Sequence, residues 1–136
     1  MSNWILKENS NQFKEVDFDI YQKLIELSIP VIELETFVDW NNISSKYNFF
    51  YDYVGNEIDI KKKLIESPLN NYSTVIIHFD CGIPTIEINT LVFIDKWEDF
   101  VSSNGYSGIF IFTNDGKYFI EFTDDSSYEL YSNFLL

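Results

Sequence analysis

The chain has 136 residues, of which 46% are hydrophobic and 18% aromatic, so we expect residues 1–136 to form one folded domain rather than a disordered segment. Acidic residues number 22 against nine basic ones, which gives a formal net charge of −13. Because all nine bases are lysine, the composition argues against a nucleic-acid-binding or phosphate-clamping protein and favours a basic protein as the partner.

The first third of the chain predicts a short strand, a helix and a second strand. We expect the short strand at Trp4 to Leu6. Apolar residues at helical spacing predict a helix that is capped by Asp17 and ends before Pro30. From Val31 to Thr36 apolar and acidic residues alternate, which predicts a half-buried strand with its acids facing solvent.

Two more helices are predicted before the chain changes character. Asp39 is a candidate N-cap for a helix that runs through Trp40 and Tyr47 to Phe50. Asn56 is a candidate N-cap for a further helix, which Pro68 would stop.

The second half is rich in β-branched and aromatic residues. Thr74 to Phe79 and Ile86 to Ile94 predict neighbouring strands. Asp95 opens an acidic variant of a capping box, which predicts a short helix through Trp97 and Val101.

A β-hairpin is predicted over Gly108 to Phe122, with Asp115 and Gly116 in a type I′ turn. Tyr128 to Leu136 fits a last strand or a short helix. Taken together, the pattern predicts an α+β fold with an antiparallel sheet built mainly from the C-terminal half and helices from the N-terminal half packed on one face.

Catalytic and cofactor motifs do not occur in the sequence. Phosphate-binding, dinucleotide-binding, serine-nucleophile and zinc spacings are all missing. His78, Asp80 and Cys81 lie close together, but their spacing matches no nucleophile motif, so we interpret His78 as structural. We therefore expect neither an enzyme nor a cofactor.

The acidic residues also fail to form a recognisable site. Asp115, Asp124, Asp125 and Glu129 lack the spacing of a calcium loop, so no metal is expected. Glu33 and Glu35 would serve glycoside hydrolysis only inside a sugar-binding cleft. A solvated acidic face explains both groups better.

The N-terminal residues lack the basic start and apolar run of a signal peptide, and no segment is apolar enough to span a membrane. The single Cys81 fits a reducing compartment. We expect a cytoplasmic protein that does not bind membranes.

Protein binding is the remaining hypothesis, because the chain holds more aromatic residues than its core can absorb and its acids occur in clusters. We predict that the partner-binding surface includes four residues near the C-terminus, with a strand face in the N-terminal half as the second choice: Asp124, Asp125, Tyr128 and Glu129, then Glu33 and Glu35.

Within Phe93 to Phe134, the stretch Trp97-Glu98-Asp99-Phe100, the strand Gly108 to Phe112, the Asp115-Gly116 turn and Tyr118 to Phe122 resemble bacterial immunity proteins of contact-dependent inhibition and polymorphic toxin systems. This resemblance implies that the chain binds a cognate toxin domain, commonly a nuclease, and blocks its active site or an essential surface. A basic nuclease would be attracted by the net negative charge.

Two alternatives stay open. A phage-type acidic mimic of nucleic acid that inhibits a host nuclease would use the same charge against a different target. An enzyme without a recognisable motif is the third hypothesis.

Overall fold

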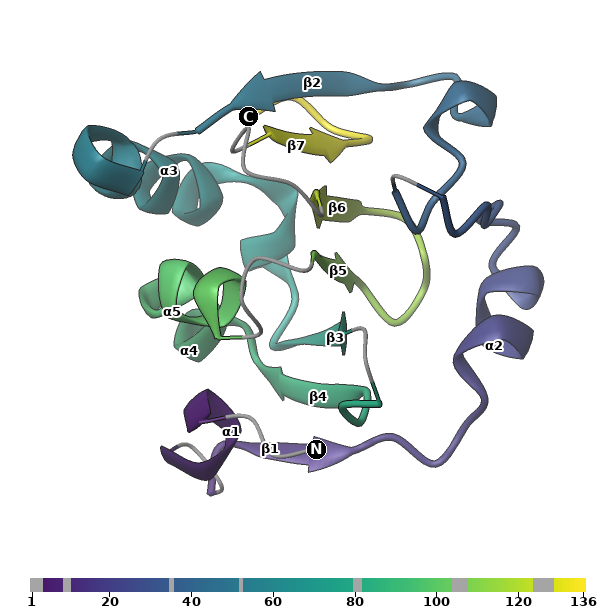
Figure 1. Ribbon diagram of the computed structural model, residues 1–136, viewed down its shortest axis with the longest axis horizontal. Coiled ribbons are helices and arrows are strands. Elements are labelled where there is room, and N and C mark those ends of the chain that lie inside the picture. Colours follow the sequence, from purple (N-terminus) through teal and green to yellow (C-terminus); the bar gives the residue numbers. More distant parts are fainter. Residues whose placement is uncertain are drawn as a thin grey trace.

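The computed structural model in Figure 1 has a central sheet with helices on both sides. Figure 1 shows α1, α3, α4 and α5 gathered on one side of the sheet and α2 on the other. The structure describes residues 4–8, 11–34, 36–51, 53–79, 82–103, 108–123 and 129–136.

The sheet is antiparallel, and its seven described strands lie in the order β1-β4-β3-β5-β6-β7-β2. The strands are β1 (Phe13–Glu15), β2 (Tyr47–Phe50), β3 (Thr74–Phe79), β4 (Ile86–Asn89), β5 (Ile109–Phe112), β6 (Phe119–Phe122) and β7 (Glu129–Ser132). The helices are α1 (Trp4–Glu8), α2 (Ile20–Glu26), α3 (Tyr53–Glu66), α4 (Thr90–Asp95) and α5 (Trp97–Ser102), with 3₁₀ helices at Trp40–Asn42 and Pro68–Asn71. The predicted α+β class, with most strands in the C-terminal half, is confirmed.

The first core lies between the sheet and α1, α3, α4 and α5. It takes alternate residues of the central strands, such as Ile77 of β3 and Ile111 of β5. Trp97 stacks on Phe122 at 5.8 Å between ring centroids, and Tyr51 meets Phe122 edge-on at 5.3 Å. Ile60 and Leu64 of α3 belong to the same core, so α3 packs on the face where α4 and α5 also lie.

The second core covers the opposite face of the sheet. Leu24 of α2 and the buried Val38 and Trp40 pack there against Phe110 and Phe119. Because both faces are covered, every residue of β5 and β6 is buried. The near-continuous apolar sequence of these two strands follows from this double burial.

Two predicted elements in the first half are wrong. Trp4 to Leu6 belongs to helix α1, where the adjacent Ile5 and Leu6 are both buried in the first core, an arrangement that an alternating strand would not allow. The predicted helix from Asp39 to Phe50 is a single 3₁₀ turn followed by β2, which pairs with β7. A strand more than 75 residues later in the chain thus decides its conformation.

Two helix starts differ from the prediction. The N-cap of α2 is Asp19, not Asp17, and its carboxylate accepts hydrogen bonds from the backbone N–H groups of Tyr21 and Gln22. Helix α3 begins at Tyr53, so Asn56 lies within it, although the helix does end before Pro68.

The predicted strand from Ile86 to Ile94 stops at Asn89, whose side chain caps α4. Asp95 is the last residue of α4, so it does not cap α5, which begins at Trp97 as its apolar spacing indicates.

The hairpin of β5 and β6 is confirmed, but its turn is not type I′. That turn needs positive φ at both central residues, and of the non-glycine residues described only Ser28 and Glu33 have it. In the connection, Gly116 has φ 73°, while Asp115 accepts hydrogen bonds from the Thr113 hydroxyl and the Lys117 N–H. The last segment forms a strand, β7.

Candidate partner-binding surface

A folded-back loop on the second face carries two exposed aliphatic residues, Ile32 and Leu34. Val31 and Val38 form a bridge that closes the loop, and the N–H groups of Ile32 and Glu33 both donate to the Phe37 carbonyl. Glu33 has φ 51°, in the left-handed region, so the chain reverses at this residue. Ile32 and Leu34 on either side of it are 41% and 76% exposed.

The predicted strand over Val31 to Thr36 is therefore wrong. Its polar and apolar residues do alternate, but of its described residues only Val31 takes part in a bridge, and the partner is Val38 of the same loop. The face expected to be buried, with Ile32 and Leu34, points to solvent. Val38 and Trp40, rather than Ile32 and Leu34, pack against the adjacent sheet face.

A buried carboxylate fixes this loop to the sheet. Glu121 of β6 is 3% exposed. One of its oxygens accepts from the Phe37 N–H at 2.7 Å, and the other accepts from the Val38 N–H at 3.2 Å and from Nε1 of Trp40 at 2.9 Å. Hydrogen bonds to charged groups are stronger than neutral ones. They hold the backbone of the loop in one conformation.

A hollow of about 700 Å³ lies beside the loop. Trp40 and Tyr131 stack in its wall, with ring centroids 5.5 Å apart and planes 23° apart. The lining residues combine aliphatic, aromatic and polar side chains: Ile32, Leu34, Thr36, Asp39, Trp40, Asn41, Lys46 and Tyr131. Four of these eight residues are polar or charged, so the hollow joins an aromatic wall to a polar one.

Acidic residues lie in or next to the segments that line this hollow, although one base, Lys46, also lines it. Glu33 lies between the two exposed aliphatic residues and accepts a hydrogen bond from the Tyr21 hydroxyl at 2.6 Å. Asp39 lines the hollow and accepts from the amide of Asn42. Glu129 lies two residues before Tyr131 on β7 and therefore on the same face of the sheet. We name the group of Ile32, Glu33, Leu34, the hollow and Glu129 the loop surface.

Two of the six predicted partner-binding residues, Glu33 and Glu129, lie on the same side of the sheet. The other four, Glu35, Asp124, Asp125 and Tyr128, lie outside the described residues. The sequence analysis missed Ile32 and Leu34, which it assigned to a core face. It also missed Glu121, although a lone acid inside the apolar run Phe119 to Phe122 is a signal for a buried polar contact.

His78 lies on β3 and is half-buried. Its Nδ1 is 3.0 Å from the Thr85 hydroxyl, and its ring lies 4.6 Å from that of Phe37. These contacts place His78 under the loop as a packing residue. Asp80 and Cys81, which the sequence analysis considered beside His78 as a catalytic group, lie outside the described residues.

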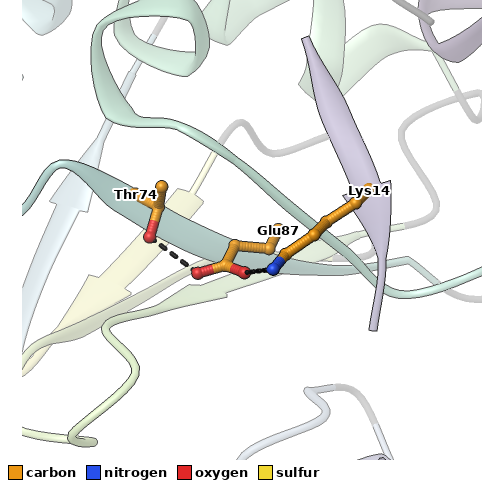
Figure 2. Close-up of polar contacts among 3 residues, drawn as sticks. All are labelled: Lys14, Thr74 and Glu87. Atoms are coloured by element: carbon orange, nitrogen blue, oxygen red, sulfur yellow. Dashed lines mark hydrogen bonds and ion pairs between the residues drawn. The ribbon is translucent and has the colours of Figure 1, made fainter. Parts of the chain in front are cut away.

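A separate polar cluster lies at the far end of the sheet, where β1 pairs with β4 (Figure 2). Glu87 accepts a hydrogen bond from the Thr74 hydroxyl at 2.8 Å and forms an ion pair with Lys14 at 3.2 Å. These contacts, led by the Thr74 hydrogen bond, hold the pKa of Glu87 below its usual range. All three side chains lie on neighbouring strands and stabilise the β1 edge.

The hairpin turn carries a second such contact. The Tyr72 hydroxyl donates to Asp115 at 2.7 Å. The Lys117 N–H, and then the Tyr72 hydroxyl, lower the pKa of Asp115, while the same hydrogen bond raises the pKa of Tyr72. Hydrogen bonds within the turn and one from the distant Tyr72 therefore hold Asp115 in place.

Among the described residues, no three His, Cys, Asp or Glu side chains gather as a metal site would require. Nor does any described helix combine the length and apolar character needed to cross a membrane. Comparison of the chain with models of known protein families and with curated proteins finds no match.

Proposed function

We propose that this protein is an immunity protein, which binds a basic toxin domain through the loop surface and blocks the active site or an essential surface of that toxin. The observation that carries the proposal is the exposed pair Ile32 and Leu34 on a loop that buried Glu121 holds rigid. Exposed aliphatic side chains on an ordered loop lose little conformational entropy when a partner covers them.

Charge supports the nature of the partner. The chain carries a formal net charge of −13. Asp39 lines the hollow together with Lys46, while Glu33 lies between two lining residues and Glu129 lies two residues before a third. An apolar centre surrounded by polar and charged groups is the usual composition of a specific interface. Nucleases that grip phosphates are basic, so the same charge would speed their association with this chain.

The test uses the toxin domain that the proposal expects to be encoded next to the gene for this chain. Calorimetry should show that Leu34→Ala weakens binding. Burying a whole leucine contributes roughly 1.5–3 kcal/mol, and the 76% of Leu34 that is exposed corresponds to about 1–2 kcal/mol, or roughly 5- to 30-fold in Kd. Cells that express the toxin should also be less well protected by Leu34→Ala than by the wild type.

Leu91→Ala is the matched control, because Leu91 is 58% exposed on α4, which covers the opposite face. It should leave both affinity and protection unchanged. Equal effects of the two substitutions, or none from Leu34→Ala, would move the interface away from the loop surface. The association rate should also fall between about 50 and about 500 mM salt, because added salt screens the attraction.

A further inference from the structure

The two edges of the sheet differ in how they are protected. β1 has only three residues, two of them charged, and Lys14 is tied to Glu87 on the neighbouring strand (Figure 2). Short length and charge are the usual means by which proteins prevent further strand pairing at an edge. β1 is thus a protected edge.

β2 at the other end is only one residue longer, and it differs from β1 in its side chains. Its residues are Tyr47, Asn48, Phe49 and Phe50, none of them charged, and Tyr47 and Phe50 are 42% and 63% exposed. β7 pairs with one side of β2, and no described strand pairs with the other (Figure 1). Every second residue of such a strand directs its backbone N–H and C=O groups outward.

The open edge continues into the loop surface. Asn48 lies opposite Tyr131, and Phe50 lies opposite Glu129. Opposite residues share a face of the sheet, so Asn48 and Phe50 lie on the face that carries the hollow. Lys46, which lines the hollow, comes directly before β2. A strand added beyond β2 would therefore lie along the border of the loop surface.

We propose that β2 is a docking edge for an extended segment of the cationic partner, which adds to the sheet as an eighth strand. Backbone hydrogen bonds would hold the segment, and its alternate side chains would reach Phe50 and the acids of the loop surface. The inference rests on the proposed function for the identity of that partner.

Charge decides between this occupant and a second copy of the chain. Pairing β2 with its own copy would bring together two molecules with a net charge of −13 each, and like charge opposes association. A cationic segment is attracted by the same field, and lysine or arginine side chains on alternate positions could reach Glu129, one strand further in.

The experiment uses a capped seven-residue peptide of alternating lysine and valine. Binding is followed by NMR, and amide hydrogen exchange is measured at the peptide concentration that gives nine-tenths occupancy. Exchange of the outward-facing β2 amides should slow roughly tenfold, the limit set by the tenth of molecules left free. Amides of β1 serve as the internal control and should not change.

Three controls test the mode of binding. A peptide with glutamate in place of lysine, and a lysine peptide with N-methylated backbone on alternate residues, should both bind at least tenfold more weakly. Phe50→Lys, at a side chain that is 63% exposed, should weaken binding of the lysine peptide by a similar factor. Far-UV circular dichroism checks that this variant is folded.

Several results would overturn the inference: no protection of β2 at saturating peptide, equal protection of β1, or equal binding of the acidic peptide. A dimer at micromolar concentration with protected β2 amides and no peptide would identify a second copy as the occupant. These measurements need no toxin. If the toxin domain binds but leaves β2 exchange unchanged, the inference fails while the proposed function stands; if the toxin does not bind at all, the proposed function fails.

Discussion

Replacing the buried Glu121 by glutamine tests the anchoring of the loop surface. The carboxylate accepts three N–H groups, and an amide has only one oxygen. The best orientation keeps that oxygen on Val38 and Trp40 and turns the NH₂ group toward the Phe37 N–H. One bond is then lost, a buried donor is left without an acceptor, and the other two bonds lose their charge assistance.

The magnitude follows from these changes. A buried unsatisfied donor costs about 1–3 kcal/mol, and each of the two remaining bonds weakens by about 0.5–1 kcal/mol. We expect Glu121→Gln to lower the free energy of unfolding by about 2–5 kcal/mol, which is a large part of the roughly 5–15 kcal/mol by which a domain is stable.

The assay is urea unfolding at pH 7, followed by circular dichroism, with hydrogen exchange at the Val38 amide to detect local release of the loop. Glu15→Gln on β1 is the control, because Glu15 is exposed and surface changes stay within about 0.5 kcal/mol. If Glu121→Gln unfolds within that margin of the wild type and Val38 stays protected, the carboxylate does not hold the loop.

Three further predictions concern stability. In urea titrations Gly116→Ala should destabilise the protein more than Gly82→Ala. Both residues have positive φ (73° and 76°), so about 1 kcal/mol of strain is common to both substitutions, but only at Gly116 would the new Cβ lie 2.8 Å from Leu27. Equal losses of stability would contradict this prediction. Asp19→Ala should cost about 1 kcal/mol through loss of the α2 cap, and Asp17→Ala almost nothing, so a reversed order would restore Asp17 as the cap. The folded state lowers the pKa of Glu87 from 4.5, so the ionised carboxylate stabilises the fold above that pH, and this contribution is lost as the pH falls through the lower folded-state pKa. The stability difference between wild type and Glu87→Gln should therefore shrink below pH 4.5. A difference that is constant with pH would contradict the assignment.

Elements with a local cause were predictable from the sequence. The β5–β6 hairpin follows from two apolar runs around Asp115-Gly116, and α3 from helical spacing that ends before Pro68. The α+β class follows from the same patterns, since β-branched and aromatic runs concentrate in the second half. The candidate site was found only in part: an acidic residue was expected at Glu33, but the aliphatic residues beside it were assigned to a core.

Tertiary structure decided the elements whose partners are distant in sequence. Tyr47–Phe50 is a strand because β7 pairs with it, and the residues around Glu33 form a loop because Glu121, more than 80 residues away, holds Phe37 and Val38 by their N–H groups. Neither partner enters a local pattern of apolar spacing. The sequence thus determined the class of the fold and the sign of the net charge. The packing of the second face decided which apolar residues stay exposed, because a sheet face filled by Val38 and Trp40 leaves no room for Ile32 and Leu34.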